Sequence, residues 1–120
     1  MTDDSRPSVL STTRLSVVVP LYNEEESVEL LYKAIVDGLA PFSGWYEIVF
    51  VDDGSADRTF EIAAGLAAAD PRLRVIKFRG NFGQTPAMAA GIDHAVGDVI
   101  VTMDGDLQND PSDILMMVAE

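Results

Sequence analysis

Short runs of β-branched and other apolar residues alternate with longer stretches of helical periodicity from Leu15 onward. The runs predict strands at residues 15–20, 47–51, 73–78 and 99–103. The stretches between them predict helices over about 24–39, 57–69 and 86–96. This alternation is typical of βαβ units, so the sequence predicts an α/β fold with a parallel sheet and flanking helices.

Helix starts are marked by caps and prolines. Thr85 is the predicted N-cap of the third helix, with Pro86 at its first position, and Asp110-Pro111 repeats this pattern. The last helical pattern is still apolar at Val118, two residues before the sequence stops. We therefore expect residues 15–120 to be a truncated domain, preceded by a disordered leader over residues 1–14, which are rich in Ser, Thr and Asp.

Composition narrows the classes of partner. The chain carries 20 acidic and 8 basic residues, a net charge of −12, so it repels nucleic acid. It has no cysteine, which excludes disulfides and thiolate metal sites. No apolar run approaches the roughly 20 residues that cross a bilayer, so we expect a cytoplasmic location. An acidic chain still binds a diphosphate if its carboxylates first capture a cation.

Polar side chains follow three of the four predicted strands. In an open parallel sheet, ligands bind beyond the carboxyl ends of the strands. The residues at these positions are Tyr22, Asn23 and Glu24 after the first strand, Asp52 and Asp53 after the second, and Asp104, Asp106 and Gln108 after the fourth. Because five of them are carboxylates, their convergence is costly unless a cation or hydrogen-bond donors compensate the repulsion.

The stretch Asp104-Gly105-Asp106 is the strongest candidate for a metal site. The small residue between the two carboxylates leaves space for a hard cation and its phosphate ligands, and Gln108 adds a third oxygen. Mg²⁺ or Mn²⁺ suits such an oxygen-only set. The alternative is a solvated acidic turn that caps the next helix. We favour the metal site because the triplet follows a strand of buried type and continues into Leu-Gln-Asn-Asp.

The Asp52-Asp53-Gly54-Ser55 stretch predicts contacts to a nucleobase or ribose. A carboxylate accepts N–H donors from a base, and Gly54 permits a tight turn. Capping of the next helix by Ser55 or Asp57 is the alternative, but it leaves the two adjacent aspartates unexplained. Stacking of Tyr22 on the base and ordinary packing remain equally open.

The glycine-containing loop over residues 79–84 is a further candidate. Arg79 and Asn81 there offer a positive charge and an amide to a diphosphate or sugar. A connection with one solvated arginine is the alternative. His94, the only histidine, lies inside a predicted helix, and we expect a structural or surface role for it.

The chain resembles the N-terminal half of glycosyltransferase family 2 in the order of its motifs. These motifs are VVVPLYNEEES, IVFVDDGSADRT and NFGQTPAMAAGIDHAVGDVIVTMDGDLQNDP. The likeness is greatest to its polyprenyl-phosphate branch, which includes dolichol-phosphate mannose synthases, and it covers residues 15–120. It implies the Rossmann-like GT-A fold of nucleotide-diphospho-sugar transferases. The implied nucleotide-binding residues are Pro20, Tyr22, Glu24, Asp52, Asp53 and Asp104; the implied metal and catalytic residues are Asp104 and Asp106, with Gln108 as a further ligand; and the implied diphosphate or sugar contacts are Arg79, Asn81 and Gln84.

The resemblance also implies a reaction. We expect a UDP- or GDP-sugar as donor, Mg²⁺ or Mn²⁺ as cofactor, a polyprenyl phosphate as acceptor, and inversion at the anomeric carbon, at the cytoplasmic face of a membrane. The oligomeric state stays open, a homo-oligomer included. Two departures from the family pattern are Gly80, where a basic residue is common, and Gly105, which replaces a frequent alanine and which we expect to be tolerated.

A phosphoacceptor receiver domain is the competing hypothesis, since it shares the chain length and an acidic pair at a strand end. Such a domain needs a lysine at a later strand end, whereas Lys33 is predicted in a helix and Lys77 inside a strand. Neither a P-loop motif nor a dinucleotide-binding glycine motif occurs.

Overall fold

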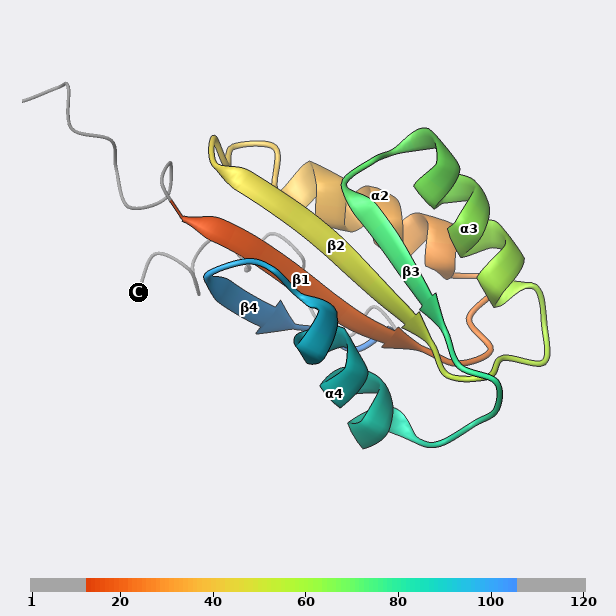
Figure 1. Ribbon diagram of the computed structural model, residues 1–120. Helices are drawn as coiled ribbons and strands as arrows, with labels where there is room; N and C mark the ends of the chain where they lie inside the picture. Colours follow the sequence, from red (N-terminus) through yellow and green to blue (C-terminus); the bar gives the residue numbers. More distant parts are fainter. Residues whose placement is uncertain (1–12, 106–120) are drawn as a thin grey trace, which may run out of the picture.

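The computed structural model describes residues 13–105, which form one parallel sheet of order β3-β2-β1-β4 covered by three helices (Figure 1). The strands are β1 (Arg14–Leu21), β2 (Trp45–Asp52), β3 (Leu73–Lys77) and β4 (Val99–Thr102), and the helices are α2 (Val28–Gly38), α3 (Thr59–Ala69) and α4 (Gln84–His94). Every predicted strand within this range is present. The predicted α/β class is therefore confirmed.

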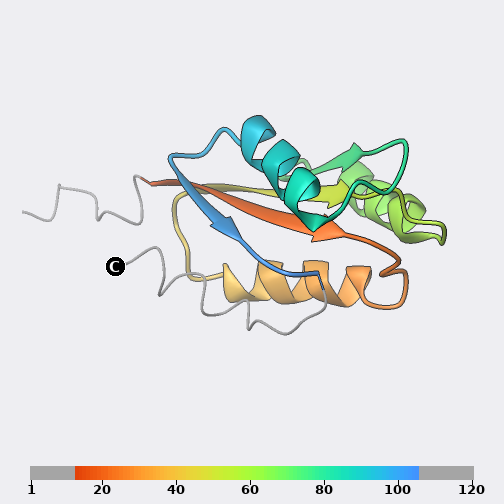
Figure 2. The same ribbon diagram turned by 90° about the horizontal axis from the view of Figure 1, so that it is seen from below.

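The sheet has one helical layer on each face. Helices α2 and α3 cover one face and α4 covers the other, as the two ribbon views show (Figures 1 and 2). Side chains of β1 and β2 alternate between the layers: Val17 and Phe50 belong to the α2–α3 core, while Val18 and Val49 pack with Ala87 of α4. Because both faces of the central strands are buried, these strands read as continuous apolar runs.

Close contact between α4 and the sheet depends on a glycine. A Cβ atom added to Gly91 would lie 2.3 Å from Val18 Cγ1 and 3.1 Å from Val51 Cγ2. The missing side chain lets the backbone of α4 approach β1 and β2. This approach brings the first residue of α4, Gln84, toward the carboxyl ends of the strands.

The helix starts differ from the predicted ones. Helix α2 begins at Val28 rather than near Glu24, because residues 25–27 form a turn in which the Glu24 carbonyl accepts the N–H of Ser27 and of Val28. The predicted N-cap of α4, Thr85, is wrong: the helix begins at Gln84 and its N-cap is Gly83. Pro86 is tolerated as the third helical residue because first-turn N–H groups lack intrahelical partners.

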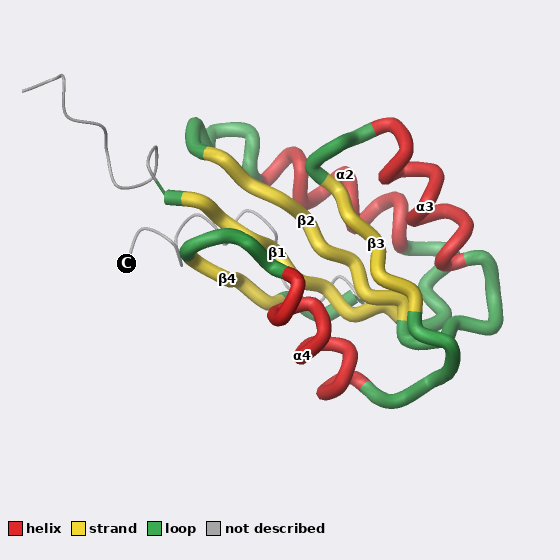
Figure 3. Tube along the Cα trace, viewed as in Figure 1, coloured by secondary structure: helices red, strands yellow, loops and turns green. Residues whose placement is uncertain are grey.

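The loops after β1, β2 and β3 gather at one end of the sheet (Figure 3). All strand pairs are parallel, so the carboxyl ends of the strands share this edge. In residues 13–105 no helix has the length and apolar character needed to cross a membrane.

Candidate functional site

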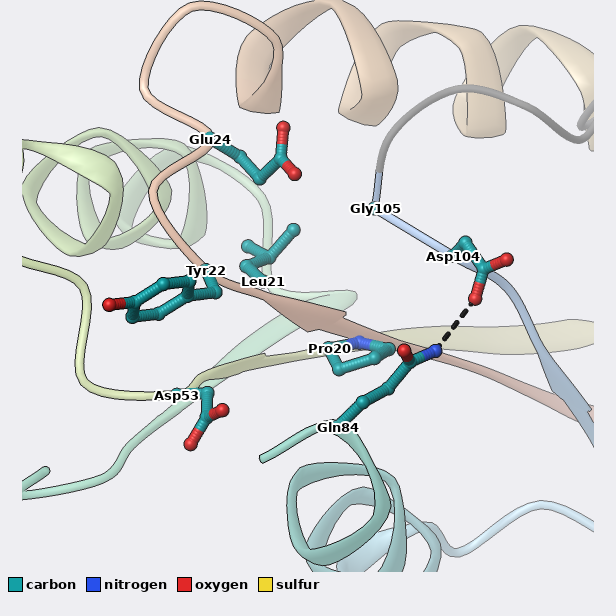
Figure 4. Close-up of a pocket in the computed structure, with 8 residues that line it drawn as sticks. All are labelled: Pro20, Leu21, Tyr22, Glu24, Asp53, Gln84, Asp104 and Gly105. Carbon is teal, nitrogen blue, oxygen red and sulfur yellow. Dashed lines mark hydrogen bonds between the residues drawn. The ribbon is translucent and has the colours of Figure 1, made fainter. Parts of the chain in front are cut away.

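A pocket of about 200 Å³ opens at the carboxyl edge of the sheet, between the ends of β1, β2 and β4 and the start of α4 (Figure 4). Its lining residues are Pro20, Leu21, Tyr22, Glu24, Asp53, Gln84, Asp104 and Gly105. All but Leu21 and Gly105 are binding residues predicted from the sequence. The chain thus brings together side chains that are up to 84 positions apart in the sequence, from Pro20 to Asp104.

Asp104 lies on the β4 side of this pocket and is half-buried. Its Oδ1 atom accepts a hydrogen bond of 2.8 Å from Nε2 of Gln84 (Figure 4). Among residues 13–105, no donor is within hydrogen-bonding distance of its Oδ2 atom. Among the described residues, one carboxylate oxygen therefore has a donor and the other has none, an arrangement that suits a hard divalent cation.

The other two predicted metal ligands, Asp106 and Gln108, lie outside the described residues. Within residues 13–105 no three His, Asp or Glu side chains gather in the manner of a complete metal site. The described part thus contributes one oxygen ligand, Asp104, to the predicted set.

Asp53 lies opposite, at the end of β2, and only 3% of its surface is exposed. Its Oδ1 accepts the Phe82 N–H at 2.8 Å, and its Oδ2 accepts the Gly83 N–H at 3.0 Å and the Asn81 side-chain amide at 2.8 Å. We call this carboxylate and its three donors the Asp53 clamp. The clamp satisfies the oxygens of a buried carboxylate with hydrogen-bond donors from the loop after β3.

The clamp changes the interpretation of the loop over residues 79–84. The sequence predicts that Asn81 faces a diphosphate or sugar, but its side chain does not line the pocket and its amide donates to Asp53. Arg79 is exposed and likewise lies outside the pocket lining. Of the three predicted diphosphate or sugar contacts, only Gln84 lines the pocket, where it binds Asp104.

Two glycines make the clamp geometrically possible. Gly54 has φ +71°, and a Cβ there would lie 2.3 Å from the Gly80 carbonyl carbon and 2.6 Å from the Asn81 nitrogen. Gly83 has φ +105°, a conformation that residues with side chains rarely adopt. The loops after β2 and β3 therefore touch backbone to backbone.

Asp52 occupies a different position from its neighbour. It is buried, lies outside the pocket lining, and its Oδ1 accepts the Ser55 N–H at 3.4 Å. Its carbonyl accepts the Phe78 N–H. Asp52 thus supports the turn after β2, whereas Asp53 lines the pocket, and contact of either residue with a nucleotide remains a prediction.

The loop after β1 is joined to the loop after β2 by a series of hydrogen bonds. Asn23 has a φ of +52°. Its Oδ1 atom accepts a hydrogen bond of 2.8 Å from the Ala56 N–H, and its own N–H donates to Ser55 Oγ at 2.9 Å. The Glu24 N–H donates to Thr59 Oγ1 at 2.7 Å. We call these contacts the loop zipper. The zipper fixes the backbone that carries Tyr22 and Glu24.

Tyr22 and Glu24 border the pocket on the β1 side (Figure 4). Tyr22 is 47% exposed, so its ring retains a free surface for a ligand. Glu24 accepts a hydrogen bond of 2.7 Å from Ser27 Oγ on its Oε2 atom. The stacking role of Tyr22 remains a prediction.

Asp57 anchors the zipper and the start of α3. Its Oδ1 accepts the Thr59 N–H at 2.9 Å, and its Oδ2 accepts the Glu25 N–H at 3.2 Å. Burial raises the pKa of this carboxyl. Hydrogen bonds from the Thr59 hydroxyl, the Thr59 N–H and the Glu25 N–H lower the pKa by more than burial raises it, so the pKa lies below its usual range. The N-cap of α3 is Arg58 rather than Ser55 or Asp57, although the Asp57 carboxylate accepts the N–H of Thr59, the first helical residue.

Sequence reasoning missed part of the site. The side chains of Asn23 and Thr59 each accept a hydrogen bond from a backbone N–H more than 30 positions away in the sequence. No local sequence pattern reveals such partners. An asparagine at a strand end, a residue type that tolerates positive φ, was the one available signal for Asn23. His94 lies on the surface, with Nδ1 against the Ala90 carbonyl, as expected.

Known proteins are similar to this chain in both sequence and fold. Residues 16–120 match the Glycosyl transferase family 2. The chain is 46% identical to the dodecaprenyl-phosphate galacturonate synthase of Rhizobium johnstonii over 92% of this chain and 33% of that protein. It is 43% identical to the prophage bactoprenol glucosyl transferase homolog of Escherichia coli, over 89% of this chain and 35% of that protein. The chain therefore spans about a third of these relatives' length.

Solved structures agree with this relationship. The mannosyltransferase PcManGT from Pyrobaculum calidifontis, in complex with GDP-Man and Mn²⁺, superposes with a TM-score of 0.76 at 28% identity, over 93% of this chain and 33% of that one. TarS 1-349 of S. aureus superposes with a TM-score of 0.68 at 25% identity, over 88% of this chain and 31% of that one. The parallel sheet and its flanking helices thus have the arrangement of GT-A glycosyltransferases. From the family match over residues 16–120, the chain belongs to glycosyltransferase family 2.

Proposed function

We propose that this chain binds a nucleoside-diphosphate sugar together with Mg²⁺ or Mn²⁺, and that it is the donor-binding part of an inverting glycosyltransferase whose acceptor is a polyprenyl phosphate. The observation that carries the proposal is the pocket in which Asp104 and Asp53 line opposite sides at the carboxyl edge of the sheet. An acidic pocket of this kind binds a diphosphate only through a cation.

Metal binding is assigned to Asp104 together with Asp106 and Gln108. The Oδ2 atom of Asp104, which has no donor among residues 13–105, fits an oxygen-preferring cation, and the Mn²⁺ complex of PcManGT supports the choice of metal class. When bound, the cation stabilises negative charge on the departing nucleoside diphosphate.

The nucleotide end is assigned to Pro20, Tyr22, Glu24 and Asp53. An ionised carboxylate has about four lone-pair sites, and the clamp uses three of those of Asp53. One site is left to accept an N–H from a base. The exposed ring of Tyr22 offers a surface for the base or ribose. PcManGT carries GDP-Man and a TarS structure carries UDP, so both nucleotides are candidates.

The acceptor is assigned from the relatives, whose names specify dodecaprenyl phosphate and bactoprenol. A phosphate oxygen of the acceptor attacks the anomeric carbon while the bond from that carbon to the nucleoside diphosphate breaks, which inverts the configuration. Because a polyprenyl phosphate is already ionised at neutral pH, its attack needs no general base. This chemistry places the intact protein at the cytoplasmic face of a membrane, where nucleotide sugars meet the lipid.

A transfer assay tests this function. The full-length protein is incubated with undecaprenyl phosphate and UDP- or GDP-sugars, with Mn²⁺ or with EDTA, and the lipid product is analysed by NMR. We expect a sugar phospholipid of inverted anomeric configuration, formed only with the metal. Retained configuration, or equal turnover in EDTA, contradicts the proposal.

The receiver-domain hypothesis has no support from the family match. Lys77, the last residue of β3, lies with Nζ 4.6 Å from the centre of the Phe60 ring rather than in the pocket. It does not take the place that a receiver domain gives to its lysine.

A further inference from the structure

We propose that Gln84 is a positioning residue that orients the Asp104 carboxylate for its cation, and that the Asp53 clamp holds Gln84 in place. This inference rests on the proposed function and goes beyond it, because it gives Gln84 and Asn81 a role through protein contacts. It also gives Asp53 a second role beside its contact to the nucleotide.

The first step is the orientation of Asp104. This residue follows a short edge strand, in which the Met103 N–H bonds to the Val18 carbonyl at 3.0 Å. β4 pairs only with β1 among the described strands. Within residues 13–105, the Gln84 amide is the one donor to the Asp104 side chain. Among the described residues, Gln84 is therefore the one that restrains the rotation of that carboxylate.

The second step is the chemistry of the contact. A carboxylate only accepts hydrogen bonds, so the Gln84 amide must present its NH₂ group to Asp104. With Oδ1 held by Gln84, Oδ2 is the oxygen that this orientation presents to the cation. Hydrogen bonds to a ligating carboxylate orient it, and losing such a partner typically lowers metal affinity by about 10–100-fold.

The third step is the placement of Gln84. It is the first residue of α4, directly after the N-cap Gly83, which has no side chain to cap the helix. The Asp53 carboxylate fixes the two residues before the helix, because it receives the Gly83 N–H at 3.0 Å and the Phe82 N–H at 2.8 Å. A negative charge at this position is also favourable to the helix dipole.

The fourth step is the rigidity of the connection. Asn81 adds a third hydrogen bond to Asp53, and Gly54 lies in direct backbone contact with Gly80 and Asn81. The end of β2 therefore fixes the loop, the loop fixes the start of α4, and Gln84 reaches from there to Asp104. Asn81 neither lines the pocket nor contacts Asp104, so Asn81→Ala tests the connection through Asp53.

The experiment measures two affinities in the full-length protein: Mn²⁺ by the EPR signal of the free ion, and UDP and GDP in the presence of Mn²⁺ by calorimetry. The variants are Gln84→Met, which keeps the side-chain length without the donor, Asn81→Ala, and the double variant. Thr85→Val, at an exposed neighbouring position outside the pocket, is the control. Gln84→Leu replaces Gln84→Met if urea unfolding shows that the latter folds poorly.

We expect Gln84→Met to weaken Mn²⁺ binding by at least about 10-fold. Asn81→Ala should weaken Mn²⁺ binding in the same direction. The double variant should be no weaker than Gln84→Met, because both changes act through one contact. Thr85→Val should match the wild type.

Three results overturn the inference. If wild-type protein binds Mn²⁺ and Gln84→Met binds it equally well, Gln84 does not position Asp104, while the proposed function stands. If the losses from Gln84→Met and Asn81→Ala add, the clamp does not act through Gln84. If the wild type binds neither Mn²⁺ nor nucleotide, the proposed function itself fails, and this inference with it.

Discussion

Gly54 is the residue where local backbone conformation and the site are most directly linked. It has φ +71°, and a Cβ atom added to it would lie 2.3 Å from the Gly80 carbonyl carbon. We expect Gly54→Ala to lower the free energy of unfolding by about 2 kcal/mol or more, since positive φ and steric overlap both oppose the methyl group.

Gly65 in α3 provides the matched control, because no atom lies within 4 Å of its added Cβ. Gly65→Ala should raise stability by about 0.5–1 kcal/mol, since alanine favours the helix. Urea unfolding measures both variants. Equal stability of Gly54→Ala and the wild type would contradict the contact described between the two loops.

Asp70 provides a prediction of pH dependence. Burial raises the pKa of this carboxyl, but hydrogen bonds from Arg72 and Tyr32 outweigh burial and bring the pKa to about 2. A lowered folded-state pKa contributes stability above the unfolded-state pKa, near 4, and this contribution disappears as the pH falls toward 2.

The partner Arg72 is half exposed, which screens the interaction, so we expect a contribution of about 1–2 kcal/mol. Asp70→Asn should remove most of it, and the stability difference from wild type should shrink between pH 4 and pH 2. Urea unfolding across this pH range measures the effect. A difference that stays constant down to pH 2 would refute the assigned cause.

Individual site residues were predictable where a motif carries their chemistry. Asp104, Asp53 and Glu24 follow strands, and the rule that ligands bind at strand ends was enough to bring them to one pocket. The partners of Asn81 and Gln84 lie 28 and 20 positions away, so the sequence did not reveal that these amides bind aspartates.

At the level of elements, the loop zipper joins β1, α2 and α3. Asp57 holds it by accepting hydrogen bonds from Thr59 and Glu25. We expect Asp57→Ala to lower the free energy of unfolding by about 1–2 kcal/mol, because the first N–H of α3 and the turn after β1 both lose their acceptor.

The same change should weaken nucleotide binding, since the zipper carries Tyr22 and Glu24 at the pocket. Asp37→Ala is the control: Asp37 is exposed on α2, and its loss should alter stability by no more than about 0.5 kcal/mol. Unfolding curves and nucleotide titrations measure the two effects. If both variants behave alike, the zipper does not support the pocket.

The order and type of elements follow from hydrophobic periodicity, whereas several boundaries do not. The sequence predicts the α2 start near Glu24, but the Glu24 carbonyl instead closes a turn with Ser27 and Val28. The α4 start depends on Gly83, whose role is set by the distant Asp53 carboxylate. The α4 boundary is decided by a tertiary contact, which local propensity does not contain, and the α2 boundary is decided by a local turn.

For the whole molecule, the central question is how an acidic chain of net charge −12 binds an anionic donor. The pocket is lined by Glu24, Asp53 and Asp104, so a nucleoside diphosphate alone meets repulsion there. A divalent cation reverses the local charge and makes diphosphate binding favourable. Donor binding should therefore depend strictly on the metal and on the carboxylates that hold it.

Calorimetric titration of the full-length protein with UDP, GDP and their sugars, with and without Mn²⁺, tests this claim most directly. Asp104→Asn and Asp106→Ala are titrated beside the wild type. We predict that at least one nucleotide sugar binds, that Mn²⁺ strengthens its binding by about 10-fold or more, about 1.4 kcal/mol, and that both variants lose this gain. Absence of binding by all four ligand types, or binding that ignores both the metal and these aspartates, would contradict the account.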